Sequence, residues 1–134
     1  MSAGTVPAVD GRRPRMRAGS IVLVVVYGAL AVAGLVGTWT FNLAFTPTAE
    51  VPSYLDGWFA NAAASSAAVD VIVTALAACL FYLVTGWRLG RPMFVVGIVL
   101  VPLTFVVALA FTFPLFLALR EIALSRGSGA PRSS

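Results

Sequence analysis

A single ionisable side chain, Asp70, interrupts the apolar segment SSAAVDVIVTALAACLFYLV at residues 65–84. Ser66 and Thr74 flank it at intervals of four residues, so the three side chains would form one polar stripe along a helix. A carboxylate inside a membrane-spanning helix costs about 2.5–3.5 kcal/mol on insertion scales, so we expect it to face other helices. One interpretation is a hydrogen-bonded contact that holds helices together, and the other is a proton or substrate site.

Further polar residues lie near the ends of the apolar segments. They predict a cluster of polar side chains around this carboxylate. We expect a polar cluster near the outer face of a helix bundle, made of Asn42, Asn61, Asp70, Arg120 and Glu121. If the third apolar segment folds back on the second, Arg120 comes level with Asn61 rather than with Asp70. A direct ion pair between Asp70 and Arg120 would therefore need a shift of one helix.

The residue types give no indication of a catalytic, metal or cofactor site. The chain has no His and one cysteine, Cys79, which excludes an intrachain disulfide and a cysteine metal cluster. A phosphate-binding glycine loop and a nucleophile with a histidine base are also missing from the sequence. We expect no cofactor, no metal ion and no enzymatic activity, and we interpret Cys79 as a small packing residue.

The composition is that of an integral membrane protein of the all-α class. Apolar residues make up 60% of the 134 residues and charged residues only 10%, against about 25% charged residues in soluble domains. The excess lies in three long runs that lack a polar face. The sequence predicts three transmembrane helices, at about residues 20–41, 58–87 and 93–119.

The charged and polar segments divide the chain into three parts. We expect a flexible Arg-rich cytoplasmic head at residues 1–19, a transmembrane domain at 20–122 and a disordered polar tail at 123–134. Within the third run, Pro102 and Pro114 each remove a backbone donor, which predicts kinks. The kinks would either bend a packing helix or provide a hinge or a free carbonyl.

The arginines predict the direction of the helices. Four precede the first run, two lie in the turn at 88–92, none lies in the connector at 46–57, and three follow the third run. By the positive-inside rule, the N-terminus is inside and the C-terminus is outside. Because the arginines flank apolar runs, topology explains the basic pI, and we expect no nucleic-acid partner.

Small residues predict how the first helix packs. Ala29, Ala33 and Gly37 are four residues apart and share one face, where two backbones can approach closely in lipid. We expect this face to pack against the Ala-rich second helix. A homodimer that uses the same face is the alternative.

Three short segments resemble a known family: TWTFN at 38–42, FANAAASSAAVDV at 59–71 and FPLFLALRE at 113–121. They are similar to a family of small bacterial membrane proteins catalogued as domain of unknown function 2834. The resemblance covers about residues 20–122 and implies an Asn after the first helix, an Asp in the second, and a Pro-Leu-Phe-Leu-x-x-Arg-Glu end to the third. These features match Asn42, Asp70 and residues 114–121, and the family brings no known reaction.

The expected function follows from the helices and from the lack of catalytic groups. We expect a structural or accessory subunit of the bacterial cytoplasmic membrane that contacts membrane lipid and associates with itself or with a larger membrane complex. The alternative is an oligomeric transporter or proton-relay component that uses Asp70.

Overall fold

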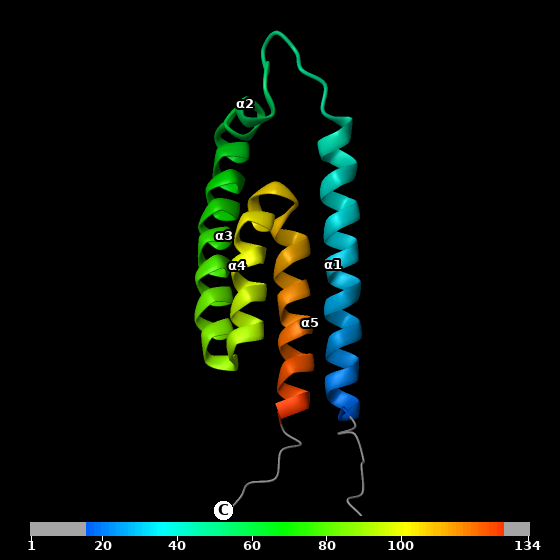
Figure 1. The fold of residues 1–134 in the computed structure, drawn as a ribbon. Coiled ribbons are helices and arrows are strands. Elements are labelled where there is room, and N and C mark those ends of the chain that lie inside the picture. Colours follow the sequence, from blue (N-terminus) through cyan, green and yellow to red (C-terminus); the bar gives the residue numbers. More distant parts are fainter. Residues whose placement is uncertain (1–15, 128–134) are drawn as a thin grey trace, which may run out of the picture.

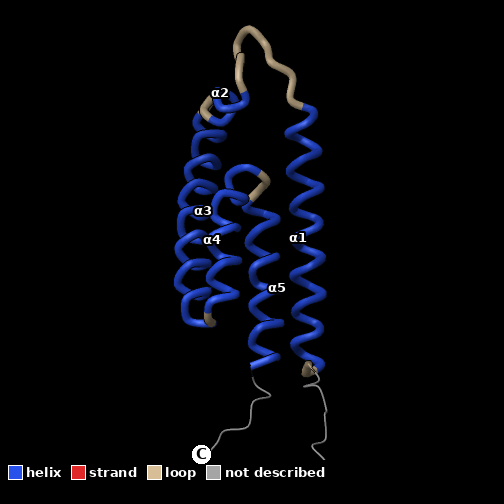
Figure 2. Tube along the Cα trace, viewed as in Figure 1, coloured by secondary structure: helices blue, strands red, loops and turns tan. Residues whose placement is uncertain are grey.

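The structure is a computed structural model that describes residues 16–127, and within that range all regular structure is helical. The elements in chain order are α1 (Ala18–Ala44), α2 (Tyr54–Trp58), α3 (Ala62–Leu89), α4 (Arg91–Val106) and α5 (Leu109–Gly127). Four long helices run side by side, and the short α2 lies above α3 at the end of an extended connector (Figures 1 and 2). The predicted all-α class is confirmed.

Two helices, α1 and α3, are long and apolar enough to cross a membrane. They contain 27 and 28 residues, or about 40 Å each at about 1.5 Å per residue, against a hydrocarbon core of about 30 Å. In the most apolar stretch of α1 only 6% of the residues are buried. Its large apolar side chains therefore face outward, unlike those of the central helix of a soluble domain, which would be mostly buried.

The third apolar run forms two antiparallel helices, which corrects the prediction of a single helix at 93–119. The chain leaves the helical path at Val107 and Ala108, midway between Pro102 in α4 and Pro114 in α5. Pro114 has no amide hydrogen for a helical bond to Ala110, and a break upstream places this proline near the start of a new helix. The two halves then pack against each other as a hairpin (Figure 1).

This hairpin brings the two ends of the described chain together. Ser20 in the first turn of α1 donates a hydrogen bond of 2.9 Å to Glu121 in the last turns of α5. Within residues 16–127 the two ends therefore lie at the same end of the helix bundle, whereas the sequence predicted an N-terminus inside and a C-terminus outside the membrane. The reason is the reversal at Val107 and Ala108, which adds one further pass along the bundle.

The helix that packs against α1 is α5, whereas the sequence predicted the second helix, now α3. In the described part of the chain α1 has no close backbone contact with α3. The two backbones approach closely at Gly34, where an added Cβ would lie 2.1 Å from the carbonyl oxygen of Ala110. That oxygen is the helical acceptor that Pro114 leaves without a donor. Gly34 and the proline thus explain why these two backbones lie so close.

The buried core lies between α3, α4 and α5. Tyr82 and Phe116 are fully buried, and their ring centroids are 4.8 Å apart. Glycines allow α3 and α4 to approach, because an added Cβ at Gly86 would lie 2.7 Å from the Met93 carbonyl oxygen. At Gly97 an added Cβ would lie 2.8 Å from the Tyr82 carbonyl oxygen. Cys79 is a buried packing residue in this core, as expected.

The connections differ in length and conformation. The predicted turn at 88–92 is present, and Gly90 links α3 to α4 with a φ of 106°, a conformation that glycine adopts readily. The predicted head at 1–19 lies mostly outside the described residues, although Ala18 and Gly19 already belong to α1. The predicted disordered tail is helical as far as Gly127, and its remainder lies outside the described residues.

Candidate functional site

A cavity of about 770 Å³ lies between α1 and α3, below the connector and beside the tip of the α4–α5 hairpin. It exists because α1 packs only on α5, so that α1 and α3 stand apart where the hairpin ends (Figure 1). Its walls are mostly apolar and include Ala75, Ala78, Phe81 and Phe113. Cavities of this size and composition are typical of sites for small, largely apolar ligands.

Polar side chains gather at the connector end of the cavity. The Tyr54 hydroxyl donates a hydrogen bond to Oδ1 of Asn42, which ties α2 to the end of α1. Both residues line the cavity, together with Thr38 and Trp58. The rings of Tyr54 and Trp58 are neighbours, with centroids 6.1 Å apart. The cavity thus has one end with hydrogen-bonding groups and aromatic faces.

The floor of the cavity is the hairpin tip, which is held to α1 by one side chain. Trp39 donates a hydrogen bond of 3.2 Å from its indole nitrogen to the carbonyl oxygen of Val107. This carbonyl belongs to the residue that follows α4, where helical partners end. Together with the packing of α5 on α1, this contact holds the tip at one height along α1 and so sets the depth of the cavity.

A buried hydroxyl cluster of Tyr82, Thr104 and Thr112 lies next to the floor and joins three helices. The Tyr82 hydroxyl donates to Oγ1 of Thr112 over 3.3 Å, and the hydroxyls of Thr104 and Thr112 are 2.9 Å apart. Each threonine hydroxyl also lies within hydrogen-bond distance of the carbonyl four residues earlier in its own helix, so one of the two donates to this carbonyl and the other can donate to its threonine neighbour. The cluster was not predicted from the sequence. The available signal was the presence of hydroxyl side chains in apolar runs, which in lipid seek partners on other helices.

Asp70 is exposed on α3, near the upper end of the cavity. It directly precedes Val71 and lies four residues before Thr74, and both of these residues line the cavity. At 100° per residue, Asp70 lies on the same side of α3 as Thr74 and the cavity-lining Ala77. Among the described residues, no side chain forms a hydrogen bond or ion pair with it. Its predicted burial against other helices is wrong, because α1 does not pack there.

Two residues of the predicted polar cluster have structural roles near the connector. Asn42 accepts the hydrogen bond from Tyr54. Asn61 caps α3, since its side-chain oxygen accepts a hydrogen bond of 2.9 Å from the amide of Ala64. Such a cap satisfies one of the amides that a helix start leaves free.

The other two residues, Arg120 and Glu121, lie at the far end of the bundle, so the five residues form no single cluster. Glu121 accepts the bond from Ser20 at the start of α1. The Nε atom of Arg120 is buried without a hydrogen-bond partner among the described residues. The expectation that both lie near the connector was based on a single third helix, and the hairpin reverses their position.

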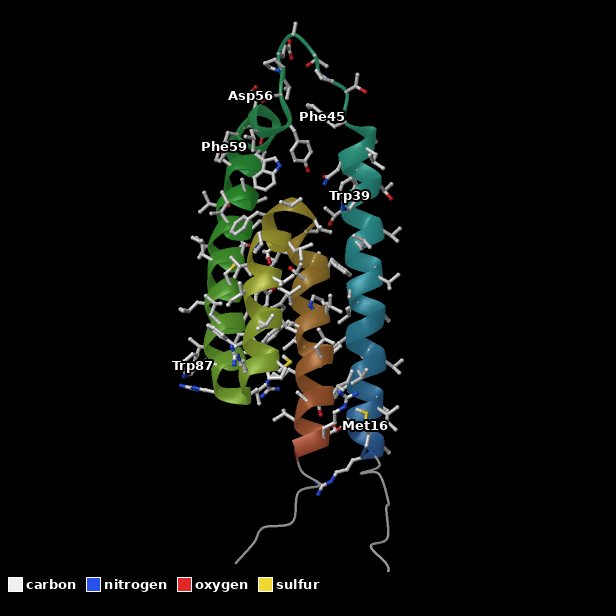
Figure 3. All side chains as sticks on the ribbon, in the orientation of Figure 1. Met16, Trp39, Phe45, Asp56, Phe59 and Trp87 are labelled. Atoms are coloured by element: carbon white, nitrogen blue, oxygen red, sulfur yellow. The ribbon has the colours of Figure 1, made fainter. Side chains whose placement is uncertain are left out.

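The described arginines share one end of the bundle. Each lies at or near the α1 start, the α3–α4 turn or the α5 end: Arg17, Arg88, Arg91, Arg120 and Arg126. The acidic residues Glu50 and Asp56 lie in the connector region at the opposite end (Figure 3). Among the described residues, no three His, Cys, Asp or Glu side chains lie together as metal ligands would.

The comparison with protein families gives one match, which covers most of the chain. A family described as "Protein of unknown function DUF2834" matches residues 26–122. The chain belongs to this family. The DUF2834 match contains the cavity-lining residues of all five helices, Asp70, and the hydroxyl cluster. It ends within α5, just after Glu121. No curated protein and no solved structure matches the chain.

Proposed function

We propose that this DUF2834 protein is a multi-pass protein of the bacterial cytoplasmic membrane, with α1, α3, α4 and α5 in the bilayer. The support is the outward-facing apolar surface of α1, where Val22, Val25 and Val32 are each more than half exposed. Such a continuous apolar surface is stable in lipid and unfavourable in water. All four elements are helices, which satisfy their own backbone groups in the absence of water.

The arginine end of the bundle is proposed to lie in the cytoplasm. The positive-inside rule then places both the start of α1 and the end of α5 inside, and the acidic connector outside. Trp87 lies at the cytoplasmic end of α3, and Trp39 lies toward the connector end of α1 (Figure 3). Tryptophan favours both membrane interfaces, so this distribution fits the same orientation.

Within the membrane, the protein is proposed to act as an accessory subunit that associates through α1, in a role of assembly rather than catalysis. The observation that carries this function is the free face of α1, defined by Ala29, Ala33 and Gly37. All three residues are exposed, and an added Cβ at Gly37 would meet nothing within 4 Å. The face points away from α5, because the buried Ala31 is on the other side of the helix. Small residues four apart permit close helix pairing in lipid, with a second copy as the simplest partner.

Disulfide trapping in native membranes tests this association. The lone native cysteine is first replaced (Cys79→Ala), and Ala33→Cys is then introduced on the free face. We expect Ala33→Cys to give a covalent dimer on oxidation and the further change Gly37→Ile to abolish it. Val32→Cys is the matched control, since Val32 is also exposed but lies off this face. Equal yields at positions 32 and 33 would indicate random collision and would refute the proposal.

A second function, transport or proton relay in an oligomer, is supported by the position of Asp70. Its carboxylate lies in an apolar helix, next in sequence to the cavity-lining Val71, which is an arrangement expected of a coupling group. The test is proton or cation flux into vesicles that contain the purified protein. Loss of flux in Asp70→Asn would support this function, and absence of flux in the unaltered protein would exclude it.

A further inference from the structure

We propose that the cavity between α1 and α3 binds an amphiphile with one apolar tail and a positively charged head group, and that Asp70 pairs with this head group. The inference goes beyond self-association, since it uses a different side of the molecule from the free face of α1. It is based on three properties of the cavity: its apolar walls, its polar and aromatic upper end, and the sign of the charge near it.

The lower part of the cavity fits an apolar tail. Ala75 and Ala78 of α3 form one wall, and the aromatic rings of Phe81 and Phe113 form the side toward the hairpin. These rings contact each other with centroids 6.0 Å apart. The volume of about 770 Å³ lies within the range of about 300–1,000 Å³ that is typical of ligand sites. In a bilayer such a space between helices is filled by a chain from the lipid phase.

The upper part offers contacts for a polar head. Asn42 and Tyr54 present an amide and a hydroxyl to the cavity, and Trp58 adds an indole ring. The faces of tyrosine and tryptophan attract cations, most strongly ammonium groups that have left water. A head group with a positive charge would therefore gain from these aromatic faces as well as from hydrogen bonds.

The charges around the cavity favour a cation over an anion. Asp70 is exposed on α3 and does not itself line the cavity, but it directly precedes Val71 and lies one turn above Thr74, and both of these residues line it. The described basic residues lie at the other end of the bundle, so within residues 16–127 no fixed cation pairs with this carboxylate. A carboxylate in an apolar helix is stabilised by a partner of opposite charge, and the head group of the ligand would be that partner.

Photolabelling in phosphatidylcholine vesicles tests the proposal with the full chain. The probes are two hexadecyl chains that carry the same diazirine, one ending in a primary amine and the other in a carboxylate. We expect saturable labelling by the amine probe, on the peptides that contain residues 71–81 and 104–113. Asp70→Asn is expected to raise the half-saturating concentration at least about tenfold, since the variant loses the charge-assisted hydrogen bond to the amine. The carboxylate probe is expected to give only weak, non-saturable labelling.

Two further variants separate the charge from the cavity. Glu50→Gln removes a carboxylate from the connector, where neither Glu50 nor its chain neighbours line the cavity, and is expected to bind the amine probe like the unaltered protein. Ala77→Phe fills the cavity at an exposed position and is expected to abolish saturable labelling while Asp70 is retained. Circular dichroism of each variant verifies folding.

Equal labelling by both probes, or an Asp70→Asn variant with unchanged affinity, would overturn the assignment of a cationic head. Saturable labelling that survives Ala77→Phe would overturn the assignment of the cavity. Because none of these measurements depends on the Ala29–Gly37 face, failure here leaves the association test unaffected, and the reverse also holds.

Discussion

The hydroxyl of Ser20 in the first turn of α1 lies 2.9 Å from the carboxylate of Glu121 in the last turns of α5. The contact joins residues 101 positions apart in the chain. It requires the third apolar run to turn back on itself, because a single straight helix would carry Glu121 to the other end of the bundle. The pair is thus the most direct indicator of the four-helix arrangement.

The first prediction is that both ends of the described chain are on the same side of the membrane. Single cysteines at Met16, Ala49 and Gly127, each in a Cys79→Ala background, are treated with a membrane-impermeant maleimide. We expect positions 16 and 127 to react in inverted vesicles and position 49 to react in right-side-out vesicles. If positions 16 and 127 reacted from opposite sides, the chain would cross the membrane three times, and this result would contradict the hairpin.

Gly34→Ala is predicted to destabilise the protein by about 1–3 kcal/mol. The new methyl group would overlap the carbonyl of Ala110, and a backbone atom cannot move aside as a side chain can. Gly28→Ala is the matched control in the same helix, since a Cβ there meets nothing within 4 Å and helix propensity favours alanine. Thermal unfolding in a mild detergent measures both. A control as unstable as Gly34→Ala would argue against close packing of α1 on α5.

In the hydroxyl cluster, Thr112→Val is predicted to cost more stability than Tyr82→Phe. Thr112 bonds Tyr82, Thr104 and its own helix, so its removal leaves buried groups unpaired, at about 1–3 kcal/mol. Tyr82→Phe removes one terminal hydroxyl, and such bonds in membranes average about 0.6 kcal/mol. Thr40→Val, an exposed threonine with a similar local bond, is the control. The opposite ranking would mean that the cluster is not centred on Thr112.

Gly90→Ala is predicted to destabilise the α3–α4 turn by about 1–3 kcal/mol. The backbone at Gly90 has φ 106° and ψ 171°, a region that is essentially restricted to glycine. Steric overlap is not the cause of the expected destabilisation, because an added Cβ would meet nothing within 4 Å. Gly19 has no such φ, so Gly19→Ala is the control. Unfolding titrations compare the stability of Gly90→Ala with that of Gly19→Ala. Equal stability of both variants would contradict the turn conformation.

Asp70→Leu is predicted to leave the melting temperature unchanged or to raise it. The carboxylate is exposed and has no partner among the described residues, so no internal bond is lost. A drop of several degrees would instead show that Asp70 holds helices together, as one interpretation of the sequence has it. Unaltered or increased stability would fit a group that is kept for binding rather than for folding.

The parts of the fold that follow from the sequence are those set by apolar length and by turn residues. The runs that form α1 and α3 are long, continuous and bounded by polar segments, so the existence of these two helices was predictable. Gly90 and Pro92 likewise marked the turn between α3 and α4. The prolines at 102 and 114 indicated a disturbed third run, but they predicted kinks rather than a reversal.

The remaining features depend on tertiary packing, which leaves little trace in a single sequence. Val107 and Ala108 are ordinary apolar residues, so nothing local marks them as a hairpin tip in a membrane. The prediction of which helix packs on α1 was wrong for a related reason. Two small-residue faces compete on this helix, and α5 takes the one with Gly34 and Ala31 rather than the one with Gly37. The predicted polar cluster was wrong as well, because its members in the third apolar run were placed by counting along a single straight helix.

The position of the hairpin tip has a consequence for biosynthesis in the proposed orientation. Insertion of α1 and α3 must translocate one short connector, which carries Glu50 and Asp56. Insertion of α4 and α5 translocates only the apolar tip at Val107 and Ala108, so this step moves no charged loop. Every described arginine remains on the ribosome side throughout. The nascent chain can therefore enter the membrane as two successive helical pairs, the second of which needs no transfer of a polar segment.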